Sequence, residues 1–210
     1  NDSNFIKLYQ FFFHSCSSQQ IQSDYIDKTN PIISYNIDLL KLSSSQNIKT
    51  EALVQIYRFI KLFHKQLCPM TSESLYFICQ FIEDSDFESI NILIEIIHYL
   101  VLNFQYDLTF ALPKILNFCS YSFFINTNAS QLLDSFLSIE LSFQPFASIF
   151  INKLTDNLSS EELDILIQKY PQFLFLIERY YKECKNSFLK VLFSLFSSYK
   201  DDELYLKVIM

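Results

Sequence analysis

The chain contains no glycine and no tryptophan among its 210 residues. Glycine lets a backbone approach a phosphate closely and occupies turns with positive φ, so its absence excludes a P-loop and a glycine-rich dinucleotide-binding turn. It also excludes the G-x-S-x-G turn of α/β-hydrolases. Tight β-hairpins depend on glycine as well, which argues against an all-β fold. Helices joined by short Asn, Ser and Asp turns need no glycine.

Charged residues are scarce, at 19% of the chain, and the net charge is −7. A nucleic-acid-binding protein usually carries a basic surface, so we expect no nucleic-acid partner. Half of the residues are hydrophobic and 17% are aromatic, which excludes a disordered chain and supplies a large core. Such an apolar composition predicts that part of the surface is covered by neighbouring chain or by partners.

The cysteines and histidines form no pattern typical of a metal site or a disulfide framework. Five cysteines stand mainly in apolar runs, with an odd total and no C-x-x-C, at Cys16, Cys68, Cys79, Cys119 and Cys184. This is typical of reduced core thiols and predicts a cytoplasmic, reducing location. The three histidines lack metal-ligand spacing, so we expect no metal and no cofactor.

An enzyme built on this chain would need a constellation that only the fold could assemble. His14 lies near Cys16, and Cys68 follows His64 by four residues, but with five cysteines and three histidines such neighbours arise by chance. Glu95 and His98 are three apart on a predicted helix, the spacing of an ordinary helical contact. We therefore expect no enzymatic activity and no small-molecule substrate.

No membrane-spanning segment is predicted, because no apolar run approaches the roughly 20 residues that a span requires. The most apolar run, 92–104, contains Glu95 and His98. The run 5–13 lacks the charged leader and small-residue cleavage site of a signal peptide. Since the chain begins with Asn1, we expect a processed protein or a fragment of a longer one.

Helix-start and helix-stop signals recur along the chain and predict about a dozen helices and no sheet. Pro69 is expected to end a helix over 48–67, and Thr71 to cap the next one. A capping box at Ser85 and Glu88 is expected to open a helix to Phe104. Because the break between these two apolar runs is so short, they should fold back as an antiparallel hairpin.

The other predicted helices follow Pro, Asn, Ser or Asp signals. They cover 3–14, 19–28, 31–42, 107–120 with a kink or restart at Pro113, 129–140, a helix to 154 with Pro145 in its first turn, 160–169, 171–185, 186–199 and a short one from 201. Ser159 and Glu162 form a second predicted capping box. Alternate starts lie about 30 to 45 residues apart, the range of helical-hairpin repeats.

The hairpins Thr71–Phe104 and Asp107–Glu140, with Pro113 in a first helix, resemble the HEAT/armadillo class of α-solenoids. The resemblance is one of pattern over about residues 30 to 200, and no signature motif accompanies it. It implies an all-α solenoid of stacked antiparallel hairpins. We expect 1–210 to be one helical-repeat domain or a segment of a longer solenoid, with 1–46 less regular and 47–200 holding the best-defined hairpins; a compact helical bundle is the alternative.

Two short basic stripes are the candidate binding residues, each with spacing that places it on one helix face. The first comprises Arg58, Lys61 and Lys65, and the second Arg179, Lys182 and Lys185. A solvated face is the ordinary interpretation. The sharper interpretation is an acidic partner, such as a tubulin tail, a phosphopeptide or an anionic lipid head group. The aromatic runs 11–13, 121–124 and 180–181 are interpreted as core packing rather than as docking surfaces.

Helical repeats without site motifs favour a non-catalytic protein–protein interaction scaffold or adaptor. The alternative is a structural subunit packed permanently in a cytoskeletal, coat or other multiprotein assembly. Both interpretations predict that the chain binds other proteins, within a larger complex. Apolar patches on both outer faces would favour the permanent assembly, and a polar convex face with one charged or aromatic groove would favour the adaptor.

Overall fold

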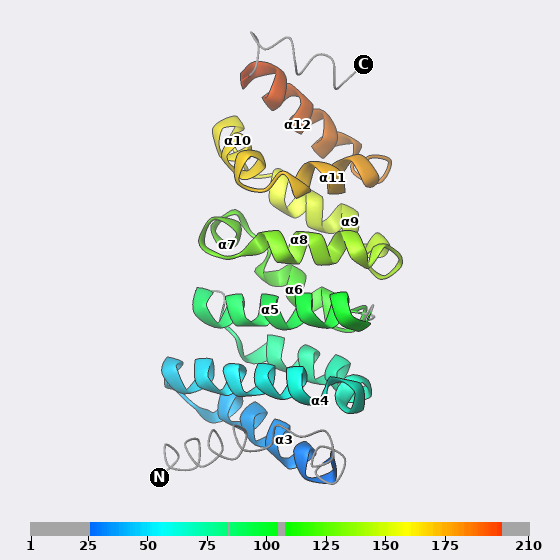
Figure 1. Ribbon diagram of the computed structural model, residues 1–210. Coiled ribbons are helices and arrows are strands. Elements are labelled where there is room, and N and C mark those ends of the chain that lie inside the picture. Colours follow the sequence, from blue (N-terminus) through cyan, green and yellow to red (C-terminus); the bar gives the residue numbers. More distant parts are fainter. Residues whose placement is uncertain (1–25, 84, 105–107, 199–210) are drawn as a thin grey trace. The chain divides into compact units, whose positions relative to one another are not determined.

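A computed structural model describes residues 26–83, 85–104 and 108–198, and all regular structure within these ranges is helical (Figure 1). The predicted helices over 3–14 and from 201 lie outside the described residues, as does most of that over 19–28. The helices are α3 (Ile26–Leu42), α4 (Gln46–Phe81), α5 (Phe87–Phe104), α6 (Leu112–Phe118), α7 (Tyr121–Asn126), α8 (Ala129–Ser138), α9 (Glu140–Thr155), α10 (Ser160–Lys169), α11 (Gln172–Arg179) and α12 (Lys185–Ser198). The all-α prediction is confirmed for the described part of the chain.

The predicted break at Pro69 is wrong, because α4 is one helix of 36 residues that includes this proline. An interior proline costs a helix about 3 kcal/mol. Apolar positions at helical spacing are buried on both sides of it, with Ile56 and Ile60 before and Leu75 and Ile78 after. Their burial favours helix on each side, so Thr71 lies inside α4 and not at a helix start. The chain divides into two compact units, Asn1–Thr71 and Ser72–Met210, and the boundary falls inside α4 just after this proline.

The two predicted capping boxes had different outcomes. Ser159 Oγ accepts from the Glu162 backbone N–H at 3.2 Å, and Glu162 Oε2 accepts from the Ser159 N–H at 2.8 Å, so this box is confirmed. The box at Ser85 does not form. Asp86 Oδ1 instead accepts from the Ser89 N–H at 3.1 Å. Helix α5 begins one residue later than predicted because aspartate at position 86 is itself a strong N-cap.

Proline positions explain several other boundaries. Pro113 restarts the chain as expected, in the first turn of α6. Pro145 lies inside α9 rather than in its first turn, because the helix already begins at Glu140. Pro171 precedes α11 as expected, but α11 ends at Arg179 instead of near 185.

Helices of the second unit pack on the helix three positions earlier in the chain. Helix α8 packs on α5, α9 on α6, α10 on α7, α11 on α8 and α12 on α9 (Figure 1). The sequence predicted two-helix hairpins as the repeating unit. The difference arises at α7, a short helix that was not predicted, because the expected helices ended at 120 and resumed at 129. Ser120 caps it by accepting from the Phe123 N–H at 3.3 Å, which separates it from α6.

The core of the second unit is strongly aromatic. Phe124, Phe136, Phe143, Phe150 and Phe173 are each less than 2% exposed. The rings of Phe136 and Phe143 stack with centroids 4.4 Å apart, and Phe150 meets both edge-on at 5.2 and 5.7 Å. The interpretation of 121–124 as core packing is confirmed at Phe123 and Phe124. In the pair 180–181, Tyr180 is buried and Tyr181 is 44% exposed. The run 11–13 lies outside the described residues.

Candidate partner-binding surface

Four helix C-termini in the second unit receive a basic side chain from the helix three positions later. Lys153 Nζ on α9 donates to the Leu116 and Asn117 carbonyls of α6 at 2.6 and 2.8 Å, and Lys169 Nζ on α10 donates to the Phe124 and Ile125 carbonyls of α7. Arg179 Nη1 on α11 donates to the Leu137 carbonyl of α8 at 2.9 Å. Lys190 Nζ on α12 donates to the Thr155 and Asp156 carbonyls that end α9. The last carbonyls of a helix have no partner within it and carry its negative pole. Each cation therefore satisfies orphan acceptors of the helix beneath it and fixes its register.

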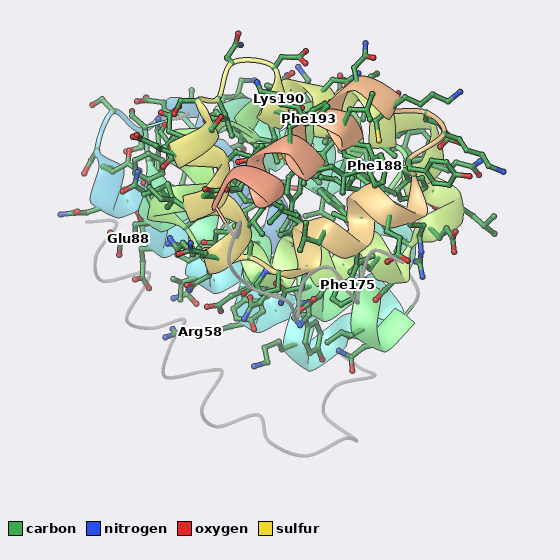
Figure 2. The ribbon with its side chains drawn as sticks, turned by 90° about the horizontal axis from the view of Figure 1, so that it is seen from above. Arg58, Glu88, Phe175, Phe188, Lys190 and Phe193 are labelled. Atoms are coloured by element: carbon green, nitrogen blue, oxygen red, sulfur yellow. The ribbon has the colours of Figure 1, made fainter. Side chains whose placement is uncertain are left out.

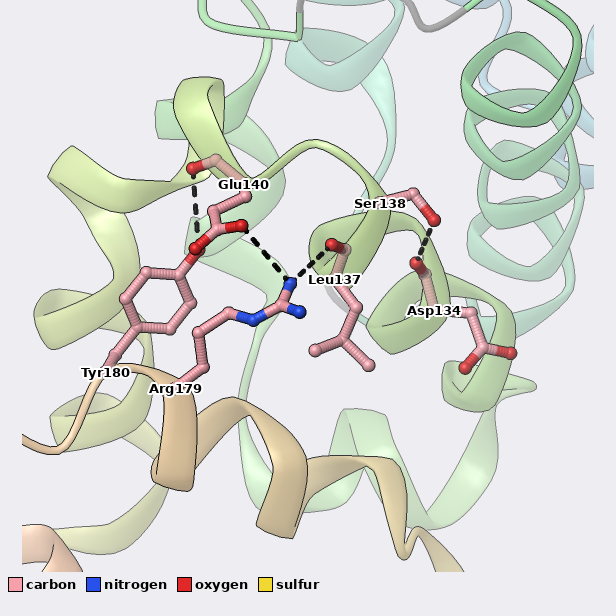
Figure 3. A network of polar contacts seen from close by, with 6 residues as sticks. All are labelled: Asp134, Leu137, Ser138, Glu140, Arg179 and Tyr180. Carbon is pink, nitrogen blue, oxygen red and sulfur yellow. Dashed lines mark hydrogen bonds and ion pairs between the residues drawn. The ribbon is translucent and has the colours of Figure 1, made fainter.

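Two of these cations are followed by a tyrosine that acts in the same place. The Tyr170 hydroxyl lies 2.6 Å from the Phe124 carbonyl oxygen and 2.7 Å from that of Thr127, at the end of α7. The Tyr180 hydroxyl donates to the Glu140 carbonyl at 3.4 Å, at the start of α9 (Figure 3). Burial, reinforced by the nearby Glu140 carboxylate, raises the pKa of Tyr180, so the hydroxyl stays a donor at neutral pH.

The predicted basic stripes lie in different environments. Arg179 donates to Leu137 and lies 3.6 Å from the Glu140 carboxylate, as Figure 3 shows, whereas Lys182 and Lys185 extend into solvent. Arg58 and Lys61 are exposed on α4 in the first unit, with the Lys61 Nζ 5.1 Å from the Tyr57 ring centroid. The side chain of Lys65 lies outside the described residues. The second stripe thus divides into one residue with a structural contact and two exposed lysines.

The exposed lysines adjoin an apolar surface on α12. The Tyr181 ring lies 6.0 Å from the Lys182 Nζ and 6.0 Å from the Phe188 ring. Leu189 and Phe193, one and two turns after Lys185, are 49% and 68% exposed. We call Tyr181, Lys182, Lys185, Leu189 and Phe193 the α12 surface. Figure 2 looks down onto helix α12 and labels Phe188, Lys190 and Phe193.

Sequence reasoning identified the two lysines of the α12 surface but not its apolar residues. Leu189 and Phe193 are four apart, which is the spacing that also marks a core-facing stripe. Nothing in the sequence distinguishes an outward stripe from an inward one. The fold makes the distinction, because Ser187, Val191, Ser194 and Leu195 take the buried face of α12.

A cleft lies between the end of α4 and α6. It has a volume of about 440 Å³ and is lined by Cys79, Gln80, Ile82, Lys114, Asn117 and Phe118. The Lys114 Nζ lies 5.7 Å from the Tyr76 ring centroid. The lining combines one amine and two amides with a buried thiol, and contains no carboxylate or histidine to serve as a general base. The cleft can donate hydrogen bonds, but it offers no acid–base pair for catalysis.

The buried thiols are poor nucleophiles. Cys79, Cys119 and Cys184 are free and buried. Burial raises the pKa of Cys79 and of Cys119 to about 12, and that of Cys184 to about 11. The thiolate is the reactive form of cysteine, so these groups remain neutral and inert at neutral pH.

Alkylation will check this assignment. In the native chain at pH 8, iodoacetamide should leave Cys79, Cys119 and Cys184 unmodified, and it should modify all three in 6 M guanidinium. Each thiol favours the folded state below the unfolded pKa of about 9. That contribution falls as the pH rises toward the folded value, so protection should weaken above pH 9. Peptide mapping by mass spectrometry measures each cysteine separately, and rapid native labelling of any of the three would contradict burial.

His98 bonds to another helix rather than to its predicted helical neighbour. Its Nδ1 lies 3.1 Å from the Ser135 Oγ of α8, and Ser135 in turn donates to the Gln131 carbonyl at 2.7 Å. Because the serine proton is used there, His98 Nδ1 acts as the donor in this pair. The contact links α5 to α8. Over the described ranges, no group of three or more His, Cys, Asp or Glu side chains could hold a metal ion.

None of the described helices combines the length and the hydrophobicity that crossing a bilayer requires. The described features that could bind a partner are the α12 surface, the donor-lined cleft and scattered exposed apolar side chains on other helices. Comparison with family models, with curated proteins and with solved structures gives no match to this chain.

Proposed function

We propose that this chain is a non-catalytic protein–protein interaction scaffold, built as an α-solenoid of the HEAT/armadillo kind. The observation that carries the proposal is the packing of α8, α9, α10, α11 and α12 each on the helix three positions earlier. An array of this kind grows by repetition and presents rows of helix surfaces instead of enclosing one cavity. Such rows suit extended partners and need no reactive groups.

The surface chemistry supports binding over catalysis. The described histidine and thiol groups are occupied in inter-helix contacts or buried as neutral groups. Apolar side chains that could fill a core are instead exposed, notably Leu141 at 88% and Ile149 at 58% on α9. Large apolar side chains left at the surface mark interaction sites when they cluster. Free thiols are in keeping with a reducing compartment, and we place the scaffold in the cytoplasm.

A permanent place in a large assembly is the second candidate, and one observation favours it. Exposed apolar side chains occur on two different rows of helices: Leu102 and Phe175 on α5 and α11, and Leu141 and Ile149 on α9. A reversible adaptor would be expected to keep all but one face polar. Obligate interfaces are larger and more apolar than transient ones.

Cross-linking with affinity purification tests both candidates. The full chain is tagged, recovered from native extract, cross-linked through lysines and analysed by mass spectrometry. We expect partner proteins cross-linked to lysines of the second unit, such as Lys182 and Lys185. Loss of the partner in about 0.5 M salt indicates a reversible adaptor, since charge contacts at interface rims are screened by salt. Retention indicates a permanent subunit. A clean monomer without cross-linked partners would contradict both.

A further inference from the structure

We propose that the α12 surface binds an acidic amphipathic helix of a partner protein. Acidic side chains of that helix lie opposite Lys182 and Lys185, and its apolar side chains cover Leu189 and Phe193. The proposal rests on the proposed scaffold function and names the site and the partner's chemistry.

Helix α12 turns two serines inward. Ser187 and Ser194 are 2% and 3% exposed. Ser187 Oγ donates to Asn152 Oδ1 at 2.6 Å, and Ser194 Oγ donates to Asp164 Oδ1 at 2.7 Å. These bonds to α9 and α10 satisfy the buried hydroxyls, which would otherwise be costly to bury. The inward face of α12 is therefore fixed by specific hydrogen bonds.

The inward face also buries Val191 and Leu195, and the outward face of α12 carries further large apolar groups. Lys185, Leu189 and Phe193 follow one another at four-residue intervals, so they form one stripe along the helix. That stripe lies on the side opposite Ser187 and Ser194, since 3.6 residues make a turn. Leaving Leu189 half exposed forgoes hydrophobic stabilisation, which a docked helix would supply.

The charge on this surface selects the partner. Helix α12 contains Lys185 and Lys190 and no acidic residue, and Lys182 stands just before it, beside Glu183. The N-terminus of α12, next to Lys185, adds the positive end of the helix dipole. The basic groups therefore gather at the N-terminal end of the stripe and the apolar groups in the two turns that follow. A complementary helix has its carboxylates at one end and its apolar residues over the next two turns.

The other basic stripe provides a comparison within the same chain. Arg58 and Lys61 are exposed on α4. No large apolar side chain of α4 between Gln46 and Lys61 is among the exposed ones. That stripe offers charge alone, and exposed charge pairs contribute little to affinity. A lipid surface is the less favoured occupant of the α12 surface, because two or three lysines attract an anionic membrane weakly and the chain as a whole carries −7.

Peptide binding to the full chain tests the proposal. The probe is a fluorescein-labelled helical peptide of about 16 residues, with glutamates in its first turn and leucines at i, i+4 and i+7 beyond them. The control peptide has the same sequence with glutamine in place of each glutamate. We expect the acidic peptide to bind with a Kd below about 1 mM and the glutamine peptide to bind several-fold more weakly. The variant K182E/K185E should weaken binding of the acidic peptide about tenfold, and Leu189→Asn about fivefold. The matched control R58E/K61E should change it less than about twofold.

These substitutions are at exposed positions, so circular dichroism and the Tm should match the unchanged chain. The proposal is overturned if the acidic peptide does not bind at about 1 mM, or if K182E/K185E and R58E/K61E weaken it equally. Binding to phosphatidylserine vesicles in preference to the peptide would assign the surface to a membrane instead. If the variant D201N/D202N/E203Q binds the acidic peptide more tightly than the unchanged chain does, the chain's own acidic segment occupies the surface. Partners that cross-link elsewhere would remove this site and leave the scaffold function standing.

Discussion

Replacing Phe150 with alanine is expected to lower the free energy of unfolding of the second unit by about 3–5 kcal/mol. Phe150 is fully buried in α9, at 0% exposure. Its ring lies 5.2 to 6.5 Å from four other buried rings: Phe124, Phe136, Phe143 and Phe173. These come from α7, α8, α9 and α11, so one side chain joins successive layers of the unit. Truncation removes the apolar burial, the edge-to-face contacts and the support for four neighbours.

Urea unfolding followed by circular dichroism measures the effect, and Phe175→Ala is the matched control. Phe175 lies on α11 and is 58% exposed, so its removal should change the unfolding free energy by no more than about 0.5 kcal/mol. A natural domain has only about 5–15 kcal/mol of stability, so F150A should move the midpoint substantially or leave the unit partly unfolded. Equal midpoints for the two variants would show that the aromatic cluster does not hold the layers together.

Local signals in the sequence were sufficient for features that depend on a few adjacent residues. The box at Ser159 and Glu162 and the restart at Pro113 were predicted because each involves atoms within one turn of helix. The failure at Pro69 has a different origin. Its effect on the backbone is local, but the burial of Leu75 and Ile78 that favours a continuous helix is tertiary. A single sequence does not report that burial.

Helix α7, and with it the packing of helices three positions apart, was missed for a similar reason. A six-residue helix such as α7 presents too few turns for apolar periodicity to be recognised. The contacts between helices three apart are made by residues about 32 to 46 positions distant, and no local pattern encodes them. One signal was nevertheless available. A basic residue followed by tyrosine ends both α10 and α11, as Lys169-Tyr170 and Arg179-Tyr180. Its recurrence at successive helix ends marks the residues that cap earlier helices.

Tyr170 therefore gives the second large effect: Tyr170→Phe should lower the free energy of unfolding by about 1–3 kcal/mol. The hydroxyl is the group shared between the Phe124 and Thr127 carbonyls, at 2.6 and 2.7 Å, and the tyrosine is only 4% exposed. Phenylalanine keeps the ring and its edge-on contact with Phe124, 5.8 Å away, so only the hydrogen bonds are lost. The Thr127 carbonyl at the end of α7 then loses this donor, while Lys169 still bonds the Phe124 and Ile125 carbonyls.

Tyr181→Phe is the matched control for the loss of a hydroxyl, since Tyr181 is 44% exposed and water replaces its hydrogen bonds. It should leave the urea midpoint unchanged. Hydrogen exchange adds a local measurement, because Y170F should speed exchange in α7 and in the turn at Thr127 more than in α5. If both variants unfold together with the wild type, the cation-and-tyrosine contacts set the register of the helices without contributing to their stability. If only Y170F is destabilised, these contacts are part of what holds each helix on the one three positions before it.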